Sequence, residues 1–212
     1  MNKNDKLLFA RYAREHFTRD VRVLEIGPDA HPSSFQGVVG HDVAAWDTLD
    51  FHTRTDVPLT YRATVEYSYP VPDASYDVVL SANVIEHVPR IWVWMKELAR
   101  ICRPGGHVVT INPISWHYHE SPIDCWRIYP AGMRALCEDS GLEVVTSEWG
   151  SMDLQWLERI SPAKLRRKYF WQRLSGVFVM WNAATRLPPE GSYDAITVAR
   201  KPADAPSSAG ER

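Results

Sequence analysis

The fold class is decided by the stretch Val21-Arg22-Val23-Leu24-Glu25-Ile26-Gly27, an apolar run that ends at a glycine. Such a run predicts a buried strand followed by a tight turn. Apolar residues at near-helical spacing over residues 6–17 predict a helix before this strand. Further runs rich in β-branched residues predict strands at residues 38–42, 76–81, 107–111, 142–146 and 193–200.

Helical patterns alternate with these strands. Residues 91–101 place their apolar side chains on one helical face, and Arg103-Pro104-Gly105-Gly106 is expected to end that helix. Pro130 suits the first position of another helix that runs through Asp139. Residues 46–72 lack a regular pattern, with one short strand near residues 61–65. The alternation predicts an α/β fold: a Rossmann-like, mostly parallel sheet with helices on both faces.

Composition limits the classes of function. The 212 residues are 45% hydrophobic and 24% charged, which predicts one globular domain over residues 1–200 and a disordered tail over 201–212. A formal net charge of −2 gives no general reason to bind nucleic acid, so we expect a small-molecule partner. No apolar run is long enough for a leader or a membrane span, which makes the cytoplasm the expected location. The three cysteines have no metal-ligand spacing, and we expect no metal.

An aromatic and basic segment precedes the last predicted strand. Residues 153–190 include Trp156, Trp171 and Trp181 around the basic run Lys164-Leu165-Arg166-Arg167-Lys168. We expect a helical insertion with a break at Pro162. Three interpretations stay open: core helices, a lid over an apolar acceptor, or a patch for a homodimer or a membrane surface.

Four blocks follow one another in a fixed order between roughly residues 20 and 147. They are Val23-Leu24-Glu25-Ile26-Gly27, Tyr76-Asp77-Val78-Val79, Asn83-Val84-Ile85-Glu86-His87-Val88, and Leu98-Ala99-Arg100-Ile101-Cys102-Arg103-Pro104-Gly105-Gly106-His107. Together they resemble the class I S-adenosylmethionine-dependent methyltransferases, in the small-molecule group. The resemblance implies S-adenosylmethionine as the cofactor and methyl transfer as the activity.

The resemblance also indicates where the cofactor would bind. Ligands of open α/β sheets bind at the carboxyl ends of strands, where a glycine turn lets them approach the backbone. This chain keeps only the first of the family's three alternating glycines, in Gly27-Pro28-Asp29-Ala30. An acidic group at the end of the second strand would accept hydrogen bonds from the ribose hydroxyls, and Asp42 is the choice, with Asp47 as the fallback. The other predicted cofactor contacts are Glu25, Glu66 near the adenine amine, Ser81, Asn83 and His87.

The loop after residues 107–111 supplies the catalytic candidates. The block from His119 to Met133 looks like one found in enzymes of glycan or secondary-metabolite pathways. A histidine with a near-neutral pKa could take the proton of an acceptor hydroxyl, so His119 is the first candidate and His117 the second. His119 could equally only hydrogen-bond the loop backbone. Asp124 and Arg127 are spaced to form a local ion pair or to contact a polar acceptor.

Two aromatic residues complete the predicted acceptor site. Trp126 is expected to be a packing anchor beside the acceptor. Tyr129 stands where a serine or threonine would cap the following helix, so it is expected to pack or to reach into the acceptor pocket. The predicted reaction is methyl transfer to a hydroxyl of a glycan-like or secondary-metabolite acceptor. N-methylation of a small amine, or a cofactor-binding module without transfer activity, are the alternatives.

Overall fold

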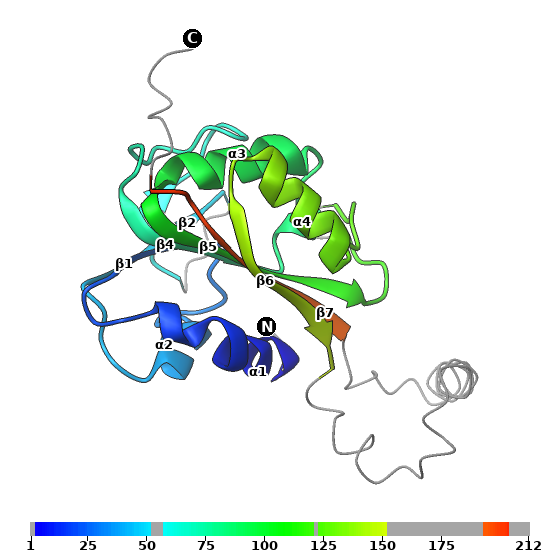
Figure 1. Ribbon diagram of the computed structural model, residues 1–212, viewed down its shortest axis with the longest axis horizontal. Coiled ribbons are helices and arrows are strands. Elements are labelled where there is room, and N and C mark those ends of the chain that lie inside the picture. The colour runs from blue at the N-terminus through cyan, green and yellow to red at the C-terminus, as the bar shows by residue number, and fades with distance from the viewer. Residues whose placement is uncertain (1–2, 52–56, 121–122, 152–192, 204–212) are drawn as a thin grey trace, which may run out of the picture.

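A seven-stranded sheet runs through the computed structural model, which describes residues 3–51, 57–120, 123–151 and 193–203 (Figure 1). The strand order is β3-β2-β1-β4-β5-β7-β6. The strands are β1 Arg22–Ile26, β2 Ala45–Asp50, β3 Tyr61–Arg62, β4 Tyr76–Ala82, β5 Cys102–Ser115, β6 Glu143–Gly150 and β7 Tyr193–Arg200. The helices are α1 Lys3–Tyr12, α2 Ser34–Val39, α3 Ile91–Ile101 and α4 Pro130–Asp139, with short 3-10 turns η1 Arg14–His16 and η2 Ile85–His87.

The sheet is mostly parallel, as the alternation of strands and helices predicts. Strands β3, β2, β1, β4 and β5 pair in parallel, whereas β7 is antiparallel to both β5 and β6. The carboxyl ends of the parallel strands therefore lie along one edge of the sheet. A ligand site at that edge is the usual consequence of this architecture.

Alternation along each central strand fills two apolar cores. In β1, Val23 points to one face while Leu24 and Ile26 point to the other, and β4 alternates in the same way. The first face packs against α1 and α2, and the second against α3 and α4 (Figure 1). Both faces are covered by helices, which confirms the predicted layering.

The predicted strand at residues 38–42 is wrong. Residues 34–39 form α2, and the second strand, β2, begins only at Ala45. Ser33 caps this helix, because its hydroxyl accepts a hydrogen bond from the Phe35 amide. The Ser33 amide in turn donates to the side-chain oxygen of Gln36. Gly40 ends the helix in the left-handed conformation. These capping residues outweigh the strand propensity of Val38 and Val39.

The Arg103-Pro104-Gly105-Gly106 block does not end α3, contrary to expectation. Helix α3 stops at Ile101, and the block lies within β5, where the pairing with β4 shifts from Tyr76–Cys102 to Val78–His107. The extra residues form a bulge. A side chain on Gly106 would meet the Asp77 carbonyl oxygen at 2.6 Å. The block is therefore a close contact between neighbouring strands.

Helix α4 begins without a side-chain cap. Tyr129 occupies the N-cap position with an extended backbone, φ −79° and ψ 161°, and its side chain makes no capping hydrogen bond. It is 60% exposed, which contradicts the predicted packing, whereas its reach into the acceptor pocket stays a prediction. Pro130 at the first helical position fixes the start of the helix instead.

Replacing Tyr129 with serine is expected to stabilise the protein by about 0.5–1 kcal/mol. The extended backbone already suits a serine cap, whose hydroxyl would satisfy one amide of the first turn. Urea denaturation measures the free energy of unfolding. Tyr129→Phe serves as the control and should leave it unchanged. A serine variant no more stable than the phenylalanine variant would contradict this account of the helix start.

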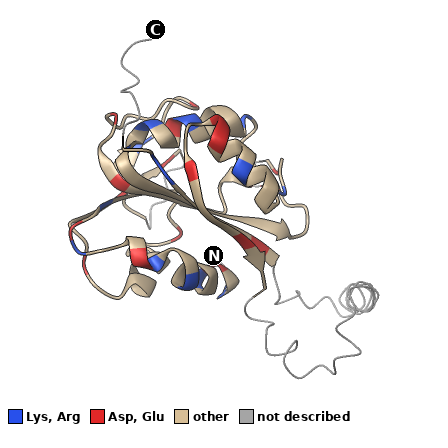
Figure 2. Ribbon diagram, in the orientation of Figure 1, with Lys and Arg blue, Asp and Glu red and all other residues tan. Residues whose placement is uncertain are grey.

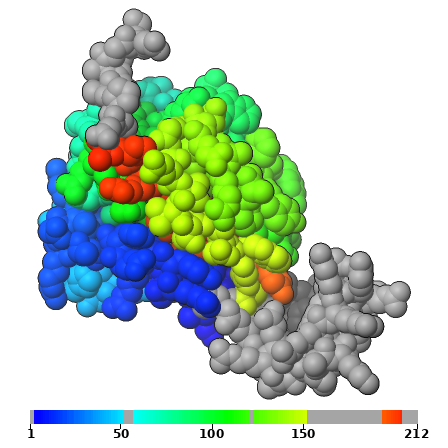
Figure 3. Space-filling model, in the orientation of Figure 1, coloured from blue at the N-terminus to red at the C-terminus, as the bar shows by residue number. Residues whose placement is uncertain are grey.

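Helix α1 lies against the end of β6 and the start of β7. Asn4 of α1 is buried and donates to the Gly150 carbonyl oxygen at 2.8 Å and to Asp194 at 2.7 Å. Figure 3 shows the blue N-terminal segment directly against the yellow-green surface of β6. In the view of Figure 2, both acidic and basic residues lie on the helices that cover the sheet. Helix α1 thus closes one side of the sheet near the carboxyl ends of its strands.

Two predicted segments fall largely outside the described residues. The aromatic insertion at 153–190 lies entirely outside them, as do residues 204–212 of the predicted tail. At the start of that tail, the Lys201 ammonium donates to the carbonyl oxygens of Ala99 and Cys102 at 2.8 and 2.9 Å. Among the described residues, no helix has the length and apolarity needed to cross a membrane.

Candidate functional site

A cavity of about 540 Å³ lies at the carboxyl ends of β1, β2 and β4. Its walls come from the turn after β1, the end of β2, the segment after β3 and the turn after β4. The lining residues are Ile26, Gly27, Pro28, Asp29, Leu49, Asp50, Phe51, Glu66, Tyr67, Tyr69, Ala82, Asn83, Val84, His87, Val88, Pro89, Trp94 and Ile123. Most of these are apolar or aromatic, with a few polar groups, which is typical of a small-molecule site.

Gly27 brings bare backbone to the wall of this cavity. Its φ is +69°, and its amide donates to the Leu49 carbonyl oxygen at 2.8 Å. A Cβ at this position would lie 2.5 Å from a methyl group of Val84. Only glycine fits both the conformation and the space. The turn predicted from the first block is confirmed.

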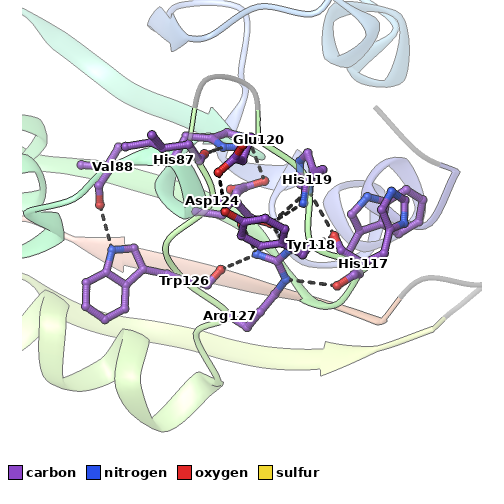
Figure 4. A network of polar contacts seen from close by, with 12 residues as sticks. His87, Val88, His117, Tyr118, His119, Glu120, Asp124, Trp126 and Arg127 are labelled. Carbon is purple, nitrogen blue, oxygen red and sulfur yellow. Dashed lines mark hydrogen bonds and ion pairs between the residues drawn. The ribbon is translucent and has the colours of Figure 1, made fainter.

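The loop after β5 carries a network of charged and aromatic residues (Figure 4). Arg127 pairs with both carboxylate oxygens of Asp124, at 2.5 and 2.7 Å. The guanidinium holds the pKa of Asp124 well below its usual range. The Asp124 carboxylate also accepts from the His119 amide at 2.8 Å. The predicted ion pair is present, and it organises the loop around His119.

The turn after β4 meets this loop. Within it Glu86 is buried, and that burial raises the pKa of its carboxyl to about 8. The neighbouring His87 lines the cavity, and its ring lies 5.1 Å from the ring of His119, nearly perpendicular to it. One imidazole, that of His87, thus lines the cavity, and His119 lies beside it but is not among the described residues that line the cavity.

Comparison with known proteins supports a specific family. A family described as "Methyltransferase domain" matches residues 38–110, which span β2, β3, β4 and the first part of β5. The match contains two of the strand ends that form the cavity. Over this part, the chain is similar to class I methyltransferases. The methyl donor of this family is S-adenosylmethionine.

Several mycobacteria have curated relatives of this part of the chain. One is an uncharacterized methyltransferase of Mycobacterium avium, 43% identical over 102 residues, which are 46% of this chain and 35% of that protein. Another, from Mycobacteroides abscessus, is 37% identical over 67 residues, 29% of this chain and 26% of that protein. The chain thus spans only about a quarter to a third of the length of these two relatives.

Solved structures share the fold over most of the chain. A SAM-dependent methyltransferase from Methanosarcina mazei has a TM-score of 0.57 at 10% identity, covering 91% of this chain and 97% of the other. Phosphoethanolamine N-methyltransferase 2 of Haemonchus contortus, in complex with S-adenosyl-L-methionine, has a TM-score of 0.56 at 16% identity, covering 94% and 53%. At these identities the likeness establishes the methyltransferase fold alone.

The acidic residue at the end of β2 is Asp50, which the sequence interpretation missed. Asp50 lines the cavity. Asp42, the predicted ribose partner, is exposed in the connection before β2, so its predicted place at the end of the strand is wrong. Asp47, the fallback, accepts from the Tyr76 hydroxyl at 2.7 Å. Both errors follow from placing the strand too early in the chain.

The remaining cofactor candidates divide into two groups. Pro28, Glu66, Asn83 and His87 line the cavity with Gly27. Glu25 and Ser81 are buried behind it, at 2% exposure each, and are not among the described residues that line it. Direct cofactor contact by the first group stays a prediction.

Glu25 holds the turn after β1 rather than facing the cavity. Its carboxylate accepts from the Ser33 hydroxyl and from the Trp46 indole, each at 2.8 Å. Ser33 in turn caps α2. Burial raises the pKa of Glu25 to about 7, although these two hydrogen bonds act against the rise. The residue therefore links β1 to β2 and to α2, the helix between them.

Replacing Glu25 with glutamine is expected to change how stability depends on pH. The pKa of Glu25 is about 7 in the folded state, against an ordinary value of 4.5. The folded state therefore keeps this proton when the unfolded state has lost it, and the wild type loses stability as pH rises from 4.5 to 7. Over that interval the free energy of unfolding of the glutamine variant should rise relative to that of the wild type, by up to about 3 kcal/mol. Urea denaturation at pH 5 and pH 8 measures this, and parallel profiles would contradict the assignment.

The other predicted acceptor residues occupy different places. His117 is exposed, with its ring 4.9 Å from that of Trp116, and its carbonyl oxygen accepts from Arg127 at 3.2 Å. Trp126 donates to the Val88 carbonyl oxygen at 2.8 Å, which anchors the loop to the turn after β4. No sequence motif marks this contact, because it joins segments that are 38 residues apart.

Proposed function

We propose that this domain transfers the methyl group of S-adenosylmethionine to a hydroxyl of a small molecule, of the glycan-like or secondary-metabolite kind. The observation that supports it is a single cavity lined by the Gly27 turn, by Asp50 and by His87. The first two are the parts of a cofactor site, and the third is a group able to handle a proton. The family match supports the cofactor, and the loop block from His119 supports the acceptor class.

The proposed reaction is a direct displacement. The acceptor oxygen bonds to the methyl carbon while the carbon–sulfur bond breaks, and the electron pair stays on sulfur to give S-adenosylhomocysteine. Holding the acceptor in line and excluding water supplies much of the rate acceleration. The hydroxyl must lose its proton, and we assign that proton to His119, which lies beside the cavity-lining His87.

His119 suits this role better than His117 or Asp124. The Nδ1 atom of His119 lies 3.3 Å from the Asp124 carboxylate, which orients the ring and holds the proton on Nδ1, so that Nε2 keeps a lone pair. Asp124 itself keeps its charge beside Arg127, so it positions the histidine and does not take the proton. His117 is exposed on the loop.

The test measures methyl transfer to a panel of acceptors. The purified chain is incubated with methyl-labelled S-adenosylmethionine and either hydroxyl-bearing or amine-bearing small molecules, and labelled product is followed together with S-adenosylhomocysteine. We expect label on a hydroxyl acceptor, reduced by His119→Gln more than by His117→Gln. Label on amines alone would favour N-methylation. Cofactor binding without any product would favour a binding module and overturn the proposal.

A further inference from the structure

Three potential metal ligands meet where the turn after β4 contacts the loop after β5. Glu86, His87 and His119 each offer one ligand atom, and these atoms lie within 4.8 Å of one another. The Glu86 side chain is 2% exposed, whereas His87 and His119 are 19% and 30% exposed. The cluster thus has a buried carboxylate on one side and two imidazoles that solvent can reach. His87 places it at the wall of the cavity.

Hydrogen bonds at Nδ1 fix the tautomers of His87 and His119. His87 Nδ1 lies 2.5 Å from the Ile123 carbonyl oxygen, so it must donate and carry the proton. His119 Nδ1 has two acceptors, the His117 carbonyl oxygen at 3.2 Å and the Asp124 carboxylate at 3.3 Å. Both Nε2 atoms therefore keep their lone pairs. Metal-binding histidines usually have such a carbonyl or carboxylate partner on the second ring nitrogen.

Backbone contacts hold the two segments together. The Cys125 amide donates to the Glu86 carbonyl oxygen at 2.7 Å, beside the Trp126 contact to Val88. The Oε2 atom of Glu86 is buried and has no hydrogen-bond partner among the described residues. A buried carboxylate oxygen without a partner is costly unless a cation or a donor satisfies it. Arg127 does not take this place, because its guanidinium donates to the Asp124 carboxylate and to the carbonyl oxygens of Trp116, His117 and Trp126.

We propose that Glu86, His87 and His119 bind a divalent transition-metal ion, of which Zn²⁺ is the representative. The ligands would be Nε2 of each histidine and a carboxylate oxygen of Glu86. Two histidines and one carboxylate are a common protein set for such ions, and they leave a coordination position open. This proposal is opposite to the expectation from the sequence, where no metal-ligand spacing and no carboxylate cluster indicated a metal.

Only a small adjustment separates the cluster from a closed site. Bonds of 2.0–2.1 Å in tetrahedral geometry bring ligand atoms to about 3.3 Å from one another. His87 Nε2 already lies 3.9 Å from Glu86 Oε1. Rotation of the two partly exposed histidine side chains would shorten the remaining distances between the ligand atoms. While the ion is bound, His119 would be a ligand and could not take the acceptor proton, so the proton transfer proposed above belongs to the metal-free chain.

Metal titration of the chain tests this site. The untagged protein is treated with a chelator, dialysed, and titrated calorimetrically with Zn²⁺ in the absence of cofactor. We expect saturable one-to-one binding. His87→Ala, His119→Ala and Glu86→Gln should each weaken it at least tenfold. His117→Ala is the matched control, an exposed histidine of the same loop that is not in the cluster, and it should stay within twofold of the wild type.

Each outcome decides the proposal independently of methyl transfer. Thermal denaturation of the apo variants checks folding, and His119→Ala, on a partly exposed loop residue, decides the matter if Glu86→Gln does not fold. Absence of saturable binding, an unchanged affinity in His119→Ala, or an equal loss in His117→Ala would overturn it. Because no cofactor is present, failure here leaves the proposed methyl transfer standing. Failure of S-adenosylhomocysteine to bind the chelated protein would count against that transfer alone.

Discussion

Replacing Asp50 with alanine is expected to weaken the binding of S-adenosylhomocysteine at least tenfold. Asp50 ends β2 at the wall of the cavity, where a carboxylate would accept hydrogen bonds from the two ribose hydroxyls. Each hydrogen bond to a charged group contributes about 1.5–3 kcal/mol, so the loss of one such bond already corresponds to about tenfold in affinity. Isothermal titration calorimetry of the wild type and the variant measures the ratio.

Asp42→Ala is the matched control for this prediction. Asp42 is also an aspartate close to β2 in the sequence, but it is exposed and lies before the strand begins. Its replacement should leave the affinity within twofold of the wild type. If Asp42→Ala weakened binding and Asp50→Ala did not, the position of β2 and the location of the cofactor site would both be wrong.

Gly106→Ala should be among the most damaging single substitutions for stability. A Cβ at residue 106 would lie 2.6 Å from the Asp77 carbonyl oxygen, 2.9 Å from Cys102 Sγ and 3.0 Å from the Arg103 carbonyl oxygen. Two of these neighbours are backbone atoms, so the strands β4 and β5 would have to separate at their bulge. We expect a loss of about 3 kcal/mol or more in the free energy of unfolding.

Gly37→Ala gives the opposite expectation and serves as its control. Gly37 lies within α2, is exposed, and would place a Cβ with no heavy atom within 4 Å. Alanine in a helix interior is more stable than glycine by about 0.5–1 kcal/mol. Urea denaturation compares both variants with the wild type. A Gly106→Ala protein as stable as the wild type would contradict the close contact between β4 and β5.

The long periodic elements were predictable because their signals are local. Helix α3 at Ile91–Ile101 and helix α4 at Pro130–Asp139 have the predicted bounds, since apolar spacing and an initial proline mark them. Strands β1, β4 and β7 coincide with apolar runs that no competing sequence pattern interrupts. The reversal of β7 was not predictable, since direction within a sheet depends on contacts between distant segments.

The second strand was missed because two local preferences compete there. Val38 and Val39 favour a strand, whereas Ser33, Gln36 and Gly40 provide a helix start and a helix stop. The capping residues were visible in the sequence and give the better prediction. That one error moved the expected ribose partner from Asp50 to Asp42.

The site was predictable only in part. The Gly27 turn follows from a single motif and is confirmed in the structure. The approach of His119 to Glu86 and His87 is different, because it joins blocks that lie 32 or more residues apart in the chain. The contacts that bring them together, such as Cys125 to Glu86, are made by backbone atoms and leave no trace in residue identity.

The most direct test of this account is whether the cavity at the ends of β1, β2 and β4 holds an adenosyl compound. Calorimetric titration of the wild-type chain with S-adenosylhomocysteine is the decisive measurement. Saturable binding of one molecule per chain, weakened by Asp50→Ala, is the result we predict. A wild-type chain that is folded by circular dichroism and gives no binding heat at millimolar ligand would contradict it.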